Sequence, residues 1–218
     1  MSEKTRSVLP KYTLGEEIMN AVTHGVGAGL SIAGTVLLII RAALRSDAMA
    51  VVASALFGSS LILLYMMSTL YHSLTAPGAK KVFRVFDHCT IFILIAGTYT
   101  PYTLVTLRGW VGWTIFGILW GVTILGIVLN AVSIEKSKIF SMIAYVVMGW
   151  CVLFAIKPTI EGLGLWGMMF VLIGGIFYTV GIIFYKKKNI KYMHSVWHFF
   201  VLAGSIFQFF SIYFWVIK

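Results

Sequence analysis

Residues 49–72 read MAVVASALFGSSLILLYMMSTLYH. Its 24 residues include no lysine, arginine, aspartate or glutamate. An α-helix needs about 20 predominantly apolar residues to cross the roughly 30 Å hydrocarbon core of a bilayer. The stretch therefore predicts a membrane-spanning helix.

Apolar stretches of similar length recur along the whole chain. Of the 218 residues, 60% are hydrophobic and 11% are charged, whereas about a quarter of the residues of a soluble domain are charged. We therefore expect an all-α, multi-pass protein of the cell membrane, folded as a seven-transmembrane-helix bundle. Hydropathy, charge and Pro/Gly breaks together predict spans at 18–40, 49–72, 84–105, 110–130, 139–156, 163–185 and 194–216.

The ends of the spans suggest a simple domain organisation. Residues 1–17 are polar and carry charges of both signs, so we expect a cytoplasmic N-terminal tail there and a transmembrane domain over 18–218. The tail lacks the apolar core and small-residue cleavage site of a removable signal peptide. Pro101 lies late in the third predicted span and is expected to kink or end that helix.

The basic residues indicate topology rather than nucleic-acid binding. The net charge is +10, but lysine and arginine sit in short loops between apolar segments. This pattern is typical of membrane proteins, so no nucleic-acid partner is expected. The positive-inside rule places the N-terminus in the cytoplasm and the C-terminus outside. Twelve of the seventeen basic residues fall on the N-terminal side: Lys4, Arg6, Lys11, Lys80, Lys81, Arg84, Lys136, Lys138, Lys186, Lys187, Lys188 and Lys191.

Five polar side chains inside the spans are predicted to share one depth. Ser68 and His72 stand one turn apart at the cytoplasmic end of the second span. Asp87 lies about 5 Å beyond the start of the third span, and His194 and His198 lie about 5 and 10 Å beyond Lys191, at 1.5 Å per residue. Residues from three helices thus converge near the cytoplasmic interface.

Three converging imidazoles favour a metal site. His194 and His198 project from one helical face, and His72 would tie a second helix to them. A three-histidine set is a known catalytic zinc arrangement with water in the fourth position. Asp87 would then serve as general base or orient a ligand, and Ser68 would donate a hydrogen bond. A hydrogen-bonded network without metal and a proton pathway are the alternatives.

The same residues resemble those of a known family. Ser68-x-x-x-His72, Asp87 within FDHCTIFILIAGTYTP, His194-x-x-x-His198 and the stretch GEEIMNAVTHGVGAGLSIAG at 15–34 are similar to the hemolysin III family. That family belongs to the progestin and adipoQ receptor group, in a superfamily with the alkaline ceramidases. The resemblance implies a seven-helix bundle with a cytoplasmic N-terminus and Zn²⁺ held by the three histidines, with Asp87 and Ser68 as partners.

The resemblance also implies candidate activities. Related members are thought to hydrolyse lipid amides such as ceramides, so a zinc-dependent hydrolase of a lipid amide or ester is the first hypothesis. A receptor-like or structural protein with a helix-clamping zinc is the second. A pore-forming cytolysin is the third, which the nearly uniform apolarity of the helices disfavours. Membrane lipids are the expected partners and substrate.

Four further residues are assigned minor roles. His24 is expected to pack in the bundle or to support the metal site from outside the ligand set. His88 points about 100° away from Asp87 on the helix and is not expected to be a ligand. Glu16 and Glu17 are expected to be solvated or to cap the first helix.

Overall fold

The computed structural model describes residues 9–10, 12–187 and 189–218. Over these residues the chain is helical and contains no strand, so the all-α prediction is confirmed. The α-helices are α1 (Leu14–Arg45), α2 (Ala48–Ser73), α3 (Pro77–Pro101), α4 (Gly109–Val132), α5 (Ile134–Gly149), α6 (Ile156–Lys186) and α7 (Met193–Ser211). Shorter helices are the π-helices η1 (Tyr102–Leu107) and η3 (Ile212–Val216) and the 3₁₀-helix η2 (Cys151–Ala155).

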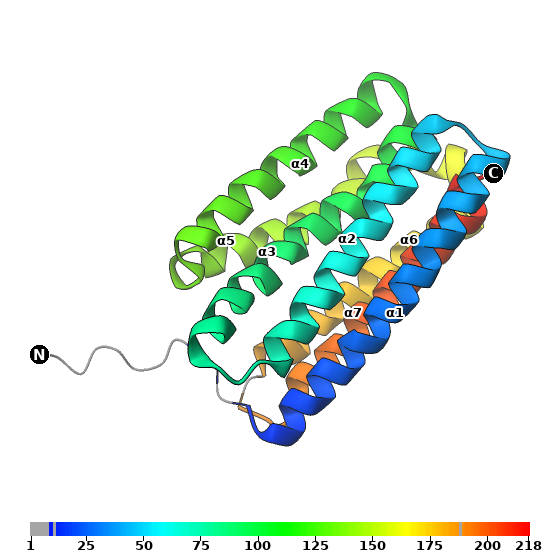
Figure 1. Cartoon of the computed structure of the whole chain (residues 1–218). Helices are drawn as coiled ribbons and strands as arrows, with labels where there is room; N and C mark the ends of the chain where they lie inside the picture. Colours follow the sequence, from blue (N-terminus) through cyan, green and yellow to red (C-terminus); the bar gives the residue numbers. More distant parts are fainter. Residues whose placement is uncertain (1–8, 11, 188) are drawn as a thin grey trace, which may run out of the picture.

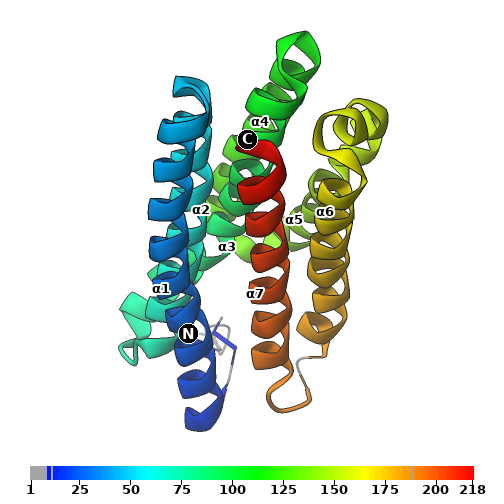
Figure 2. The same cartoon turned by 90° about the vertical axis from the view of Figure 1, so that its right-hand side faces the viewer.

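The helices form a bundle of rods that run roughly along one axis, with successive helices reversing direction (Figure 1). α1 packs on α2, α2 on α3 and α6 on α7, and α1 also packs on α7 (Figure 2). The first and last helices are therefore neighbours. We call the end where α1, α3, α5 and α7 begin the N-terminal end of the bundle; the C-terminus lies at the opposite end.

By length and composition, six helical segments of the described chain could cross a membrane. The fifth is the continuous segment Ile134–Lys186, which contains α5, η2 and α6. Both spans predicted at 139–156 and 163–185 lie within it. Large apolar side chains such as Trp110, Trp166 and Phe154 are exposed on the outside, as expected for surfaces that face lipid rather than water.

The first helix begins earlier than its apolar run. α1 starts at Leu14, not at residue 18, because Thr13 and Glu16 form a capping box. The Glu16 carboxylate accepts a hydrogen bond from the Thr13 main-chain N–H at 2.8 Å, and the Thr13 hydroxyl accepts one from the Glu16 N–H. The capping role expected for Glu16 is thus confirmed. Glu17, placed in the tail by hydropathy, lies inside the first turn of α1.

Two irregular positions interrupt the helices. Pro101 ends α3, as predicted, and the chain continues as the π-helix η1 because proline cannot donate a main-chain hydrogen bond. Within α6, Gly164 has a φ of +71°, which separates the first turns of α6 from its long straight part. A side chain at this backbone conformation would be strained, and glycine avoids that strain.

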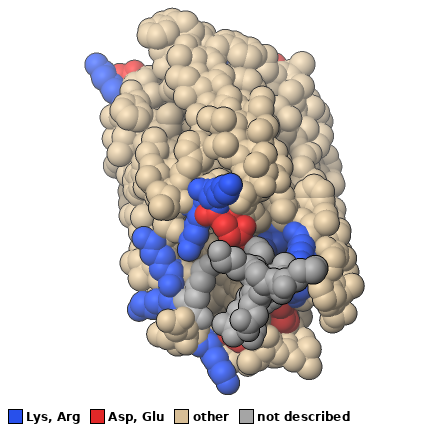
Figure 3. Space-filling model, turned by 90° about the vertical axis from the view of Figure 1, so that its left-hand side faces the viewer, with Lys and Arg blue, Asp and Glu red and all other residues tan. Residues whose placement is uncertain are grey.

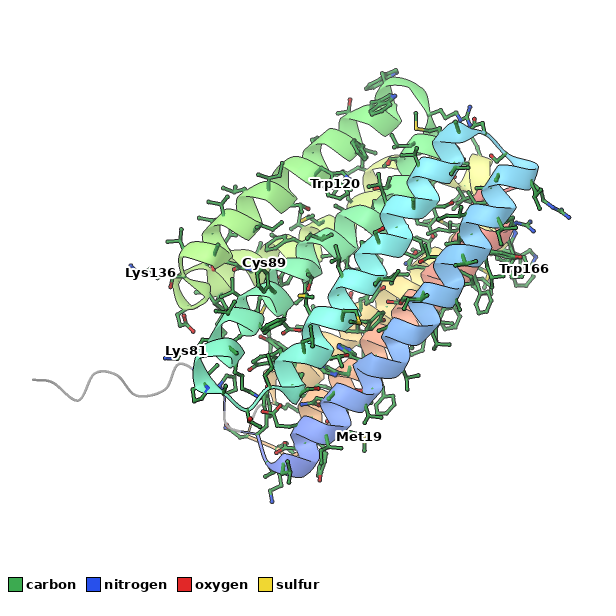
Figure 4. The ribbon with its side chains drawn as sticks, viewed as in Figure 1. Met19, Lys81, Cys89, Trp120, Lys136 and Trp166 are labelled. Atoms are coloured by element: carbon green, nitrogen blue, oxygen red, sulfur yellow. The ribbon has the colours of Figure 1, made fainter. Side chains whose placement is uncertain are left out.

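Charged residues gather at the ends of the rods. Figure 3 shows lysine and arginine side chains mainly in the lower part of the view, below a broad uncharged surface. Figure 4 places Lys81 and Lys136 at the N-terminal end of the bundle and Trp166 at the opposite end. Of the twelve basic residues assigned to the N-terminal side, four lie outside the described residues: Lys4, Arg6, Lys11 and Lys188.

Candidate metal centre

The structure brings the three predicted imidazoles together at the N-terminal end of the bundle. His72 stands in the last turn of α2, and His194 and His198 stand in the first turns of α7. One ring nitrogen from each lies within 4.8 Å of the others. His194 and His198 face each other through their Nε2 atoms at 3.2 Å. His72 and His198 are fully buried in the interior, and His194 is partly exposed.

The tautomer of His198 follows from its surroundings. The Thr23 hydroxyl lies 3.2 Å from Nδ1 of His198. That hydroxyl already donates its single hydrogen to the Met19 carbonyl at 2.8 Å, so it accepts from the ring. The main-chain carbonyl of Asn20, 3.3 Å from the same nitrogen, is a second acceptor. Nδ1 of His198 therefore carries the hydrogen, and Nε2 turns a lone pair toward the cluster.

The ring of His72 is oriented like that of His198, with its Nδ1 hydrogen bonded outside the cluster and its Nε2 toward the cluster. Its Nδ1 lies 2.6 Å from the Glu17 carboxylate, which as an ionised group only accepts hydrogen bonds. Its Nε2 is buried and has no hydrogen-bond partner among the described residues. A buried nitrogen without a partner is destabilising, typically by about 1–3 kcal/mol. A cation held among the three imidazoles would give this unpartnered Nε2 of His72 a partner.

The donor set fits zinc. Nitrogen ligands bind zinc at about 2.0–2.1 Å, so donors on one tetrahedral ion stand about 3.3 Å apart. Nε2 of His194 and Nε2 of His198 are already at that spacing, 3.2 Å apart, and a ring nitrogen of His72 lies within 4.8 Å of the donors of the other two rings. Three neutral imidazoles would leave a fourth position open.

Asp87 and Ser68 lie beside the cluster rather than in it. Both are buried, with 5% and 1% of their surface exposed. The Ser68 hydroxyl lies close to the Asp87 carboxylate but forms no well-aligned hydrogen bond. Asp87 is outside the group of mutually close donor atoms. Asp87 also lines a cavity next to the cluster.

His88 lies next to Asp87 but outside the cluster. Its Nδ1 is 3.0 Å from the Arg84 carbonyl and 3.5 Å from the Asp87 carboxylate. The ring is thereby held toward α3 itself. The three mutually close donors do not include it.

A cavity lies next to the cluster, although none of the three imidazoles is among its lining residues. Its volume is about 160 Å³, and its lining includes Asp87 and His24, whose ring stacks on that of His198. Along α3 the lining runs from Asp87 to Tyr102, a distance of about 22 Å at 1.5 Å per residue. Half of the hydrocarbon core of a bilayer measures roughly 15 Å. The cavity is therefore long enough to hold an extended lipid acyl chain.

The wall of the cavity is mainly apolar and aromatic. α5 packs on α3 and α4, whereas α6 packs on α7, and cavity residues line the space between α5 and α6. These include Met142, Val146, Leu172, Gly175 and Ile182. Pockets that bind small molecules are typically lined in this way, mainly by apolar and aromatic side chains with a few polar groups.

Tyr12 covers the cluster at the N-terminal end. Its ring stacks on that of His194 with centroids 5.1 Å apart and meets that of His72 at 5.6 Å. Burial raises the pKa of the Tyr12 phenol well above its usual range, so the phenol is neutral. The aromatic ring shields the imidazoles from water on that side.

Apart from the supporting role considered for His24, sequence reasoning missed the part that α1 plays in this site. Glu17, Asn20, Thr23 and His24 all contact one of the three imidazoles. A signal was present, because these residues recur every three or four positions on an otherwise apolar helix. Such a polar stripe on a membrane helix faces the bundle interior rather than lipid.

Comparison with known proteins gives consistent matches over nearly the whole chain. Residues 12–209 match the family model described as Haemolysin-III related. The chain is 46% identical to Hemolysin-3 of Bacillus cereus over 202 residues, covering 93% of this chain and 92% of that protein. It is 43% identical to the Hemolysin-3 homolog of Bacillus subtilis (strain 168) over 207 residues, covering 95% and 97%.

A more distant match is to a human protein. The chain is 24% identical to Monocyte to macrophage differentiation factor of Homo sapiens over 211 residues. The match covers 93% of this chain and 85% of the human protein.

Proposed function

The chain belongs to the haemolysin-III-related family of multi-pass membrane proteins, and from this premise we propose that it is a zinc-dependent hydrolase of an amide or ester bond in a membrane lipid. One observation carries the proposal. A cluster of three imidazoles has a buried carboxylate beside it, that of Asp87, and Asp87 also lines a long, mainly apolar cavity. Metal donors, a proton acceptor and a space for hydrocarbon are the three parts that such a reaction needs.

Each protein group has a role in this proposal. His72, His194 and His198 would hold the ion. When bound, zinc would supply Lewis acidity and lower the pKa of a water ligand to about 7. Asp87 would accept a proton from the attacking water and return it to the departing amine or alcohol as the carbonyl carbon–nitrogen or carbon–oxygen bond breaks. Ser68 would hold the carboxylate or the substrate carbonyl in place by a hydrogen bond.

The proposed topology places this site close to the cytoplasm. Because α5 and α6 run in opposite directions (Figure 1), we assign Ile134–Lys186 as two spans, giving seven in all. The excess of basic residues at the N-terminal end assigns that end to the cytoplasm. Cysteines introduced at Lys81 and Lys157, after replacement of Cys89 and Cys151, test this. Only the Lys157→Cys position should react with a membrane-impermeant thiol reagent in intact cells.

A structural clamp is the second candidate function. His72 and the two histidines of α7 join helices that are far apart in the sequence, so a bound ion would stabilise the bundle without any reaction. In that case replacement of a ligand would lower thermal stability, and no lipid would be processed.

Pore formation is the reading suggested by the name of the Bacillus cereus relative, Hemolysin-3. Exposed large side chains on the described helices are mostly apolar, whereas a water-filled pore needs a polar lumen. Leakage from liposomes that depends on formation of an oligomer would favour this function over hydrolysis.

Turnover of labelled lipids tests the hydrolase directly. The purified chain, reconstituted with zinc, is incubated with long-chain amides and esters, and the released fatty acid is measured. We expect release that is lost in the His194→Ala and Asp87→Asn variants. Release no greater than that of His194→Ala would refute the proposal, and a metal content retained in the same sample would then favour the clamp.

A further inference from the structure

Helix α1 supplies none of the three imidazoles, yet one of its faces contacts two of them by hydrogen bonds. We propose that Glu17 is a positioning residue of the metal centre. Its carboxylate accepts the Nδ1 hydrogen of His72 and thereby holds the ring with Nε2 toward the ion. The inference rests on the proposed metal site but not on the proposed hydrolysis.

The Glu17 carboxylate is fixed through both of its oxygens. Oε2 lies 2.6 Å from Nδ1 of His72, and Oε1 lies 2.6 Å from the Lys80 ammonium group. Lys80, in the first turn of α3, also donates to the Leu74 carbonyl at 3.2 Å. The carboxylate is thus anchored independently of the imidazole. An anchored acceptor can select the orientation and tautomer of the ring it contacts.

The side-chain amide of Asn20 would favour the other tautomer of His72, so the tautomer that binds a metal depends on Glu17. Asn20 Oδ1 accepts a 2.6 Å hydrogen bond from the Ser195 hydroxyl, which turns the Asn20 Nδ2 group toward His72. Nδ2 lies 3.4 Å from Nδ1 of His72. An amide NH₂ only donates. Without Glu17, the nearest polar group would favour a lone pair on Nδ1 and place the hydrogen on Nε2, the nitrogen that faces the cluster.

An ordinary ion pair at the same end of the bundle offers a comparison. Arg84 and Glu135 lie 2.7 Å apart, and the Glu135 side chain is 54% exposed. Loss of this ion pair removes a charge contact at the surface, whereas loss of Glu17 changes the nitrogen that His72 offers to a metal.

The test measures metal binding rather than turnover. Zinc affinity of the full-length chain in detergent is measured by chelator competition, and ligand geometry by the visible spectrum of the Co²⁺-loaded protein. Glu17→Ala should weaken zinc binding by about 10–100-fold, as for other groups that orient a metal-ligating histidine, and should change the cobalt spectrum. Glu17→Gln, which keeps the size of the side chain, should give an intermediate loss. Glu135→Ala should bind zinc like the unmodified chain.

A second-site change provides a rescue. Asn20→Asp places a carboxylate beside Nδ1 of His72, so the double variant Glu17→Ala/Asn20→Asp should recover part of the lost affinity and the original cobalt spectrum. Equal affinity and equal spectra for the unmodified chain, Glu17→Ala and Glu17→Gln would overturn the inference alone. If the unmodified chain binds neither zinc nor cobalt, the metal site itself is refuted and the inference falls with it.

Discussion

The imidazole rings of His24 and His198 stack face to face, with centroids 3.5 Å apart and planes 9° from parallel. One ring comes from the first helix and the other from the last, so the contact joins the two ends of the chain beside the candidate metal centre. His24 is 2% exposed and also meets the Tyr65 ring edge-on at 5.0 Å. The stack therefore fixes the plane in which His198 offers its Nε2 atom.

Removal of the His24 ring should destabilise both the candidate metal centre and the helix bundle. His24→Ala deletes a large buried side chain and should lower the free energy of unfolding by about 2–5 kcal/mol. His24→Phe keeps an aromatic ring and should retain most of that stability. Thermal unfolding of the metal-free protein in detergent measures both, with Val26→Ala, at a position that is 54% exposed, as a control on the same helix. Equal losses for the alanine and phenylalanine variants would show that stacking contributes nothing.

Asp87 should be needed for turnover and not for metal binding. The carboxylate lies outside the group of close donor atoms, so Asp87→Asn should bind zinc with nearly unchanged affinity. Loss of a general base typically lowers the rate by about 10²–10⁴-fold. Parallel measurements of zinc content and fatty-acid release check both parts. A variant that loses its zinc would instead identify Asp87 as a ligand.

The cavity should determine which lipids are accepted. Leu172 lines it on the α6 side, so Leu172→Trp should fill part of the space and raise KM for long-chain substrates while a short-chain ester is still cleaved. Ile176 lies one turn further along α6 and is 51% exposed. The matched variant Ile176→Trp should behave like the unmodified chain. If both variants treat all chain lengths alike, the cavity is not the acyl-chain site.

Asp47 lies at the end of the bundle away from the candidate metal centre, and its charge should make the free energy of unfolding depend on pH. The Ala50 main-chain N–H, 2.9 Å away, and the Arg108 guanidinium hold the pKa of the Asp47 carboxyl below its usual value. A depressed pKa stabilises the fold above the unfolded-state pKa of about 3.9, and this contribution disappears as the pH falls through the folded-state value. The variant Asp47→Asn keeps a side chain that can cap the N-terminus of α2 but removes the charge.

The unmodified chain should therefore unfold at a higher temperature than Asp47→Asn at pH 7, and the difference should shrink as the pH falls below about 3.9. Thermal unfolding of both proteins across this range is the measurement. A difference that does not change with pH would assign the effect to something other than the charge of Asp47.

Hydropathy predicted the helices well because the bilayer demands long apolar runs. α2 and α4 begin and end within two residues of the spans predicted at 49–72 and 110–130. The start of α1 was missed because a capping box extends that helix into polar sequence at residues 13–17, which hydropathy does not register. Helical turns also fill the interval between the spans predicted at 139–156 and 163–185, because α6 already begins at Ile156.

The three imidazoles could be grouped from the sequence because helix rise and loop charges fix the depth of each residue in the membrane. The contacts of α1 could not be predicted in this way. Glu17 contacts the ring of His72, which lies 55 positions further along the chain. This contact depends on which face of α1 packs against α2 and α7. Depth is encoded in hydropathy, whereas rotation of a helix about its axis depends on side-chain packing. The cavity between α5 and α6 depends on packing in the same way.

An anomalous-difference map recorded at the zinc absorption edge, from crystals of the protein purified with zinc, shows whether the three imidazoles hold the ion. We expect one peak per chain, about 2.0–2.1 Å from a ring nitrogen of each of His72, His194 and His198. A map without a peak at these three rings, or with the ion held elsewhere in the bundle, would refute the metal centre.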